Sequence, residues 1–361
     1  MPLYHSGYGR PRKKKRSLFR KIMIWVIVLI LILAAASAYY LYRIVFDPNV
    51  WTPKGEVVSV TIPTGSDFED VKQILYQNGL IIHRNNFEWL AQKKKYPKKV
   101  KPGMYEIRNG MNNNELINLL RSGEQTPVKV TFNNIRDIYQ LAGVVGRQIE
   151  ADSASIVQLL TDSVYMAGMG LNKETAATIF IPNTYEFYWN TSAKGFVERM
   201  HDEYVKFWSG DRSNIAGKMG LRIDEVVTLA SIVEKETNKD DERAAIAGVY
   251  VNRLKSEWRL QADPTLVYAL GDFNITRVLN EHKKIDSPYN TYAHLGLPPG
   301  PICIPSIASI DAVLNYKKSE YMFFCARDDL SGYHVFAKTN KGHSRNAKKY
   351  REALNRMKIY K

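Results

Sequence analysis

An uncharged apolar run near the N-terminus is the feature that most constrains this chain. Residues 22–42 contain no charged side chain and are rich in Ile, Leu, Val and Ala. A helix rises about 1.5 Å per residue, so a run of this length can cross the hydrocarbon core of a bilayer. Trp25 near one end, and Tyr39, Tyr40 and Tyr42 at the other, suit the two interfaces. The sequence therefore predicts a transmembrane helix over Ile22–Tyr42.

The residues before this run form a basic tail. Residues 1–21 carry eight Lys and Arg side chains and no Asp or Glu. Such a tail can be an arm that binds nucleic acid, but the positive-inside rule already explains it as a cytoplasmic tail, with the body exported. We therefore expect no nucleic-acid partner. A cleaved signal peptide is the competing interpretation, since residues 34–38 are small. The length of the run and the aromatic residues beyond it favour an uncleaved anchor.

Composition limits the rest of the chain. With 361 residues, of which 45% are hydrophobic, it can build one large or two ordinary domains. The two cysteines, Cys303 and Cys325, both lie in the exported part, where a disulfide and two free thiols are equally compatible with the sequence. No Cys/His cluster has zinc spacing, and phosphate-binding and dinucleotide-binding glycine motifs are missing from the sequence. We expect neither a metal nor a cofactor.

A linker over 43–56 leads to a predicted small α+β module over 57–130. The expected elements are strands at Val57–Ile62, Gly103–Ile107 and Val128–Phe132, a helix with Ser66 as N-cap and Glu69 at N3, a helix at Asn85–Lys93, and a helix capped by Asn112. The segment 57–93 resembles a LysM module, which binds glycan chains. A spacer without binding function is the alternative.

The remaining residues, 131–361, are predicted to form a larger α+β domain. Residues 134–222 look mainly helical, except for Phe180–Trp189, which predicts a strand, a turn and a second strand dense in aromatics. Such a cluster is ordinarily core, but it can also hold sugar rings. A helix is expected over Glu242–Leu254, with an apolar face formed by Ala245, Ile246, Val249, Tyr250 and Leu254. A hairpin at 321–326 and 334–337 should precede a basic helix from about Asn346.

The stretch 229–237 is the centre of this domain. Val226, Leu229, Ala230 and Val233 form one apolar stripe at helical spacing, which predicts a buried helix. Glu234 and Glu236 fall on the two shoulders of that stripe, about 160° apart, so they cannot share one small site. Glutamates on a helix are ordinarily solvated. A carboxyl that is half desolvated instead has a raised pKa and can act as a general acid.

Five motifs in this domain occur in a fixed order. They are 234–237 (Glu-Lys-Glu-Thr), 250–254 (Tyr-Val-Asn-Arg-Leu), 259–265 (Arg-Leu-Gln-Ala-Asp-Pro-Thr), 289–292 (Tyr-Asn-Thr-Tyr) and 296–302 (Gly-Leu-Pro-Pro-Gly-Pro-Ile). In this order they resemble the MltG (YceG-like) endolytic murein transglycosylases, over about residues 57–357. The resemblance implies a single-pass protein of the bacterial inner (cytoplasmic) membrane, with its N-terminus in the cytoplasm and its catalytic domain outside.

The resemblance also implies a reaction. These enzymes are carbon–oxygen lyases that cut nascent peptidoglycan strands between N-acetylmuramic acid and N-acetylglucosamine, which would end strand elongation beside peptidoglycan synthases. The 6-hydroxyl of the muramic acid closes a 1,6-anhydro ring, so one carboxyl can serve first as acid and then as base. The N-acetyl group of the substrate can replace a second carboxylate.

By resemblance the catalytic role falls on Glu236, with Glu234 as the second choice. The residues expected to bind substrate are Gln261, Asp263, Thr265, Tyr268, Tyr289, Asn290, Tyr292, Asn183 and Tyr185. Asn183 stands where the aromatic turn of the family commonly has Asp, and a turn-capping role would make the two interchangeable. Two other functions fit the sequence: a tethered scaffold that binds peptidoglycan without cutting it, and a muramidase-type hydrolase that admits water.

Overall fold

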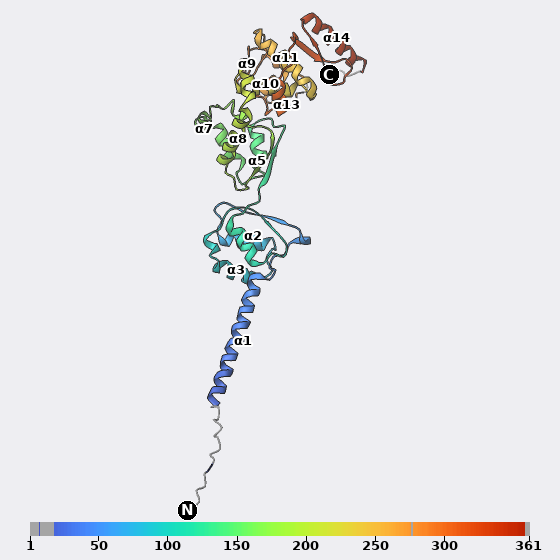
Figure 1. The fold of residues 1–361 in the computed structure, drawn as a ribbon. Helices are drawn as coiled ribbons and strands as arrows, with labels where there is room; N and C mark the ends of the chain where they lie inside the picture. The colour runs from blue at the N-terminus through green and yellow to red at the C-terminus, as the bar shows by residue number, and fades with distance from the viewer. Residues whose placement is uncertain (1–6, 8–17, 276, 358–361) are drawn as a thin grey trace, which may run out of the picture. The chain divides into compact units, whose positions relative to one another are not determined.

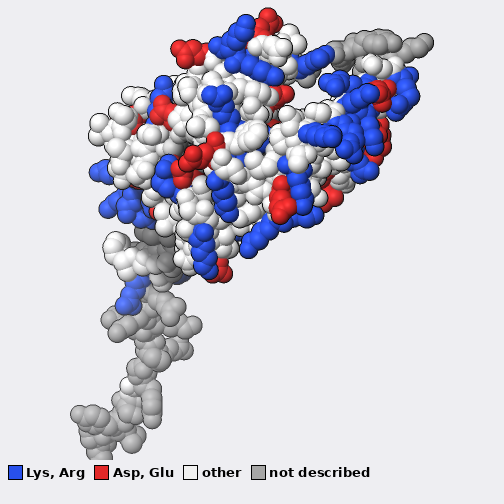
Figure 2. All heavy atoms as spheres, turned by 90° about the horizontal axis from the view of Figure 1, so that it is seen from above, with Lys and Arg blue, Asp and Glu red and all other residues white. Residues whose placement is uncertain are grey.

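A computed structural model describes residue 7 and residues 18–275 and 277–357, and its helices and strands make an α+β protein. The chain divides into two compact units, Met1–Thr126 and Pro127–Lys361. Each unit has hydrophobic core residues of its own. The net charge of +15 is visible on the surface, because Lys and Arg outnumber Asp and Glu on the face shown in Figure 2. The predicted basic tail falls mostly outside the described residues.

The N-terminal helix α1 covers Leu18–Phe46, longer at both ends than the predicted span. It is the one helix in the described part of the chain that is long and apolar enough to cross a membrane, with a mean hydropathy of 2.7 over its central window. Its side chains are exposed from Leu18 to Arg43. Its last turn is docked on the first unit, because the Asn113 side-chain amide donates a hydrogen bond of 2.8 Å to the Ile44 carbonyl. Figure 1 shows α1 running into this unit.

The first unit contains a two-stranded sheet and three further helices. Strands β1 (Val58–Ile62) and β2 (Gly103–Ile107) are antiparallel, with Val60 opposite Tyr105. Between them lie α2 (Phe68–Gln77) and α3 (Arg84–Lys93), and α4 (Asn113–Ser122) follows β2. Short 3₁₀ turns occur at Pro53–Gly55 and Tyr96–Lys98. Alternate residues of β2 face a hydrophobic core. This core includes residues of β1, β2, α2, α3 and α4. The segment from β1 through α2 and α3 to β2 thus folds around one two-stranded sheet.

The N-cap of α2 differs from the prediction by one residue. Asp67, and not Ser66, accepts the backbone N–H groups of Glu69 and Asp70, while Asp70 accepts the N–H of Asp67. Both frames fit the sequence pattern of a capping box. The structure adopts the second, and α2 buries Phe68, Val71 and Leu75 on one face. The predicted cap of α4, Asn112 with Glu115, is confirmed.

The second unit begins with strand β3 (Val128–Phe132), so the predicted module end at residue 130 falls inside a strand of the second unit. Helices α5 (Ile138–Val145), α6 (Ser153–Thr161) and α7 (Ser163–Gly168) follow, then a 3₁₀ turn at Ala176–Ile179. Strand β4 (Asn183–Phe187) pairs antiparallel with β3. The predicted second strand within 180–189 is wrong: the partner of β4 lies some fifty residues earlier, which a local pattern cannot reveal.

Helix α10 (Ile223–Glu236) is the central element of the C-terminal half of the second unit. It packs against α9 (Asp211–Met219), α11 (Asp240–Lys255), α12 (Asp263–Leu270) and α13 (Ile307–Leu314). Figure 1 shows these helices gathered around it. Every residue from Val226 to Val233 is buried, so the predicted apolar stripe is confirmed and the burial extends to the rest of the helix surface. Helix α8 (Ala193–Trp208) precedes this group and also packs on α6.

The C-terminal region is a hairpin followed by a helix. Strands β5 (Phe323–Ala326) and β6 (His334–Ala337) pair antiparallel, with Ala326 opposite His334, as predicted. Helix α14 (Asn340–Arg356) packs on both strands. It begins six residues before the predicted start at Asn346, because the Thr339 hydroxyl accepts the Gly342 N–H and caps the first turn. A 3₁₀ turn at His282–Lys284 lies in the long loop between α12 and α13.

Candidate active site

The two glutamates at the end of α10 have different surroundings. Glu234 Oε2 accepts hydrogen bonds from the Ser306 hydroxyl at 2.6 Å and the Ser309 hydroxyl at 2.5 Å. Its other oxygen lies 3.7 Å from the Arg243 guanidinium. Burial alone would raise the pKa of Glu234, but the two hydroxyls and the Arg243 charge outweigh it and lower the pKa. Glu234 is therefore an ionised side chain that ties α10 to α13 and α11.

Glu236 is the last residue of α10, and its carboxyl is bound by α11. Tyr250 donates a hydrogen bond of 2.6 Å to Glu236 Oε1. Burial raises the pKa of Glu236 to about 7; the Tyr250 hydrogen bond and the Arg253 charge oppose the rise, and the charge of Asp263 adds to it. The C-terminal end of a helix is the negative end of its dipole, which also disfavours the carboxylate. At neutral pH Glu236 thus holds a proton far more readily than an ordinary glutamate does.

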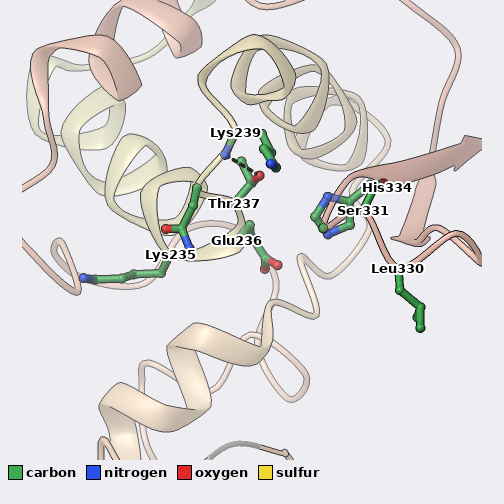
Figure 3. Close-up of a pocket in the computed structure, with 9 residues that line it drawn as sticks. Lys235, Glu236, Thr237, Lys239, Leu330, Ser331 and His334 are labelled. Atoms are coloured by element: carbon green, nitrogen blue, oxygen red, sulfur yellow. Dashed lines mark hydrogen bonds between the residues drawn. The ribbon is translucent and has the colours of Figure 1, made fainter. Parts of the chain in front are cut away.

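An open hollow borders this carboxyl. Its volume is about 490 Å³. One side is built from the end of α10 and the residues before α11, the other from the loop between β5 and β6: Lys235, Glu236, Thr237, Asn238, Lys239, Leu330, Ser331, Gly332 and His334. Figure 3 shows Glu236 and His334 on the border of this hollow. A proton donor of pKa near 7 beside an open hollow has the properties of a general acid.

Asp263 and Tyr292 interact with the surroundings of Glu236, whereas Tyr268 and Tyr289 contact each other. Asp263 starts α12 and accepts a hydrogen bond of 2.5 Å from the Tyr292 hydroxyl. Burial raises the pKa of Tyr292, and the hydrogen bond to Asp263 and the charges of Asp263 and Glu236 raise it further, so these groups are electrostatic neighbours. The rings of Tyr268 and Tyr289 lie 4.7 Å apart, centroid to centroid, and both are half-buried. Of the residues expected to bind substrate, Asp263 and Tyr292 thus lie close to Glu236.

Asn290 and Thr265 are not placed to contact a ligand, contrary to expectation. The Asn290 side-chain amide donates to the carbonyls of Lys283 and Ile285 and accepts the N–H groups of Tyr292 and Ala293, which uses its full capacity. The Thr265 hydroxyl bonds to Thr291 at 2.8 Å and is fully buried. Both side chains shape the loop that carries Tyr289 and Tyr292. Gln261 is exposed, with a left-handed backbone φ of 52°.

The aromatic segment around Asn183 belongs to another part of the second unit. Tyr185 is buried, its hydroxyl donates to the Ile181 carbonyl at 2.6 Å, and its ring stacks on Phe132. Its role is core packing. Asn183 is exposed at the start of β4, where its side chain accepts the Thr184 N–H. No contact found among the described residues joins either side chain to Glu236.

The groups that contact or orient the Glu236 carboxyl were not predicted from the sequence. Tyr250 was counted as part of the apolar face of its helix, although a buried phenol needs a hydrogen-bond partner, and that need was the available signal. Arg253 is buried, donates to the Leu260 and Met322 carbonyls, and reduces the pKa of Glu236. His334 and its partner Glu242 gave no sequence signal, since they lie 92 residues apart.

The acidic, histidine and cysteine side chains bear on metal binding and on the state of the two cysteines, which the sequence left open between a disulfide and two free thiols. Over residues 18–275 and 277–357, no three His, Cys, Asp or Glu side chains gather in a way that could hold a metal ion. Cys303 and Cys325 are both free thiols. Burial raises the pKa of Cys303 to about 12, so this thiol is unreactive at neutral pH.

Comparisons with known proteins agree on one family. The YceG-like family model matches residues 60–349. A Bacillus subtilis (strain 168) protein named endolytic murein transglycosylase is 30% identical over 319 residues, covering 82% of this chain and 86% of that protein. A protein of the same name from Streptococcus pneumoniae serotype 2 is 30% identical over 347 residues, covering 86% of this chain and 62% of that protein.

A solved structure matches as well. The crystal structure of a YceG-like protein from Listeria monocytogenes superposes with a TM-score of 0.54 at 27% identity, covering 81% of this chain and 99% of that one. The chain belongs to the YceG-like family. The family resemblance inferred from the five motifs is confirmed.

Proposed function

We propose that this chain is a membrane-anchored lytic transglycosylase that cuts peptidoglycan glycan strands internally. The observation that carries the proposal is Glu236, a glutamic acid of pKa about 7 at the edge of an open hollow, held by Tyr250. Relatives that span most of the chain are named endolytic murein transglycosylases, which agrees with this chemistry.

The proposed reaction needs one carboxyl in two protonation states. Protonated Glu236 gives its proton to the oxygen of the bond between N-acetylmuramic acid and N-acetylglucosamine as the C1–oxygen bond breaks. The positive charge that develops at C1 is stabilised by the N-acetyl group of the muramic acid. The Glu236 carboxylate then takes the proton of the 6-hydroxyl, whose oxygen bonds to C1. One bond forms, one breaks and no water enters, so the new end is a 1,6-anhydro sugar.

Product analysis tests this function. Purified sacculi digested by the full-length protein should yield muropeptides with anhydro ends, each lighter by one water than the corresponding reducing end. Reducing ends in their place would identify the muramidase-type hydrolase. Binding to sacculi without any new ends would identify the non-catalytic scaffold.

We propose that the first unit binds glycan as a LysM-like module. The order β1, α2, α3, β2, with the two strands paired antiparallel, supports this likeness. Replacing residues 47–126 by a flexible linker should weaken binding to sacculi while short soluble glycans are still cut. This exchange removes the whole hydrophobic core of the unit, whereas removal of 57–93 would leave half of it exposed. Equal loss of binding and cleavage would contradict the proposal.

We propose that α1 anchors the protein with residues 1–21 in the cytoplasm and the two units outside. The apolar length of α1 and the basic tail before it support this orientation. A reporter enzyme that works only after export, fused behind Lys361, should be active, and the same reporter fused before Met1 should be silent. The opposite pattern, or a mature N-terminus near Ala38, would reject the anchor.

A further inference from the structure

The hollow beside Glu236 has a second wall that the catalytic motifs do not provide. It comes from residues 327–334, which connect β5 and β6 about a hundred residues after Glu236. The Arg327 N–H donates to the Tyr333 carbonyl at 2.9 Å and closes this connection into a loop. The Tyr333 ring lies under the Lys239 ammonium, with 4.8 Å from Nζ to the ring centroid. The loop is thus held against the start of α11.

His334 has the strongest attachment in this loop. Its backbone N–H donates to Glu242 Oε1 at 2.8 Å, and its ring Nδ1 lies 2.9 Å from Glu242 Oε2. Glu242 is 8% exposed, and each of its carboxylate oxygens is bonded to His334. The ring also packs edge-on against Phe324, with 5.4 Å between centroids. Two hydrogen bonds and one ring contact therefore fix the imidazole in one orientation.

This arrangement determines which ring nitrogen is available. A carboxylate only accepts hydrogen bonds, so Nδ1 carries the proton that it shares with Glu242. In the neutral ring Nε2 then has a lone pair. Over the described residues Nε2 has no protein hydrogen-bond partner, while the His334 side chain borders the hollow that Glu236 borders. The molecule thus keeps an oriented acceptor at the wall of its catalytic hollow.

We propose that His334 binds the glycan: its Nε2 accepts a hydrogen bond from a hydroxyl or acetamido N–H of a sugar seated against Glu236. The inference rests on the proposed function, since it takes the occupant of the hollow to be the glycan strand. Glu242 is the positioning residue of this contact, and His334 is a substrate-binding residue and takes no part in proton transfer.

Two substitutions separate binding from folding. In His334→Asn the side-chain nitrogen can replace Nδ1 and keep the bond to Glu242, but nothing reaches the position of Nε2. Its melting temperature should stay within about 2 °C of wild type, while KM rises about 3- to 10-fold at unchanged kcat, the loss of one neutral hydrogen bond. In His334→Gln the longer amide reaches the Nε2 position, so KM should return toward the wild-type value even though the bond to Glu242 is weakened. A purely structural His334 predicts KM changes that follow the melting temperature in both variants, and that result overturns the inference.

A binding measurement covers the case in which the substitutions unfold the chain. In the full-length Glu236→Gln protein, labelled at histidine, the His334 ring signals should shift when an uncrosslinked peptidoglycan tetrasaccharide is added. His201 on α8, which lies outside the hollow, is the matched control: its signals should stay, and His201→Asn should keep wild-type KM and kcat. A His334 signal that does not move while the tetrasaccharide binds overturns the inference. Failure of the proposed function shows elsewhere, as wild-type protein that releases no anhydro ends.

Discussion

Replacing Glu236 with glutamine should abolish the release of 1,6-anhydro ends and leave the protein folded. Glutamine keeps the size of the side chain and can still accept the Tyr250 hydrogen bond, but it cannot deliver a proton. Loss of general acid catalysis is worth about 10²–10⁴-fold. Because the same group serves both half-reactions, we expect the upper end of that range. If a folded Glu236→Gln protein formed anhydro ends at near wild-type rate, Glu236 would have no part in the mechanism.

The pH dependence of Glu236 gives an independent reading of the same residue. Its folded pKa of about 7 lies above the ordinary value of 4.5. Its contribution to stability is therefore fully present below about pH 4.5 and is lost as pH rises through 7. The wild type should melt at lower temperature at pH 8 than at pH 5, and Glu236→Gln should lack most of that difference. Activity should fall about tenfold per pH unit above 7, as the acid form is depleted.

Replacing Glu234 with alanine should produce the opposite result, a protein damaged in stability and not in chemistry. The substitution removes the acceptor of the Ser306 and Ser309 hydroxyls and leaves Arg243 half paired. Charged hydrogen bonds of this kind are worth about 1.5–3 kcal/mol each, or about 3–6 kcal/mol for the pair. Because Glu234 is partly exposed, water can replace part of this, and we expect a loss of about 2–4 kcal/mol. In a unit of this size that corresponds to a melting temperature lower by about 5–15 °C.

The controls for Glu234→Ala follow from its surroundings. Below the melting transition the variant should keep most of its cleavage activity. The folded pKa of Glu234 is lowered, so its contribution is present above about pH 4.5 and disappears as pH falls further, which should make variant and wild type converge in acid. Glu198→Ala, at an exposed ion pair on α8, should stay within about 0.5 kcal/mol of wild type. A folded, stable and inactive Glu234→Ala protein would exchange the roles of the two glutamates.

The different surroundings of Glu234 and Glu236 were predictable because they follow from helix geometry. Two residues on one helix that are two positions apart point in different directions, whatever the rest of the chain does. The partners that set the pKa values of the two glutamates were harder to predict from the sequence. Ser306 and Ser309 lie more than 70 residues from Glu234, and nothing local marks a serine as the partner of a distant carboxylate. The role of Tyr250 could in principle have been predicted from the sequence, but Tyr250 was assigned to the apolar face of its helix.

The same distinction explains the errors in the fold. The strands β1, β2, β5 and β6 and the cap of α4 were predicted correctly, because alternation and capping are local signals. The pairing of β4 with β3 is a contact over fifty residues and was missed. Asn290 was assigned to substrate because an amide in a polar loop suits a sugar. Its four hydrogen bonds to the surrounding backbone could be found only from the folded loop.

The bond between Asn113 and the last turn of α1 has a mechanical consequence. The 29 residues of α1 span about 43 Å, while the hydrocarbon core of a bilayer is about 30 Å thick. An α1 that crosses the bilayer, as we propose, therefore exceeds this core by roughly two turns in total. The Asn113 hydrogen bond holds the last turn of α1 against the rest of the first unit. Without a flexible spacer between them, the first unit would follow the tilt of the helix. Bilayer thickness, which sets the tilt of a transmembrane helix, would then tune the height at which this unit meets a strand leaving the membrane.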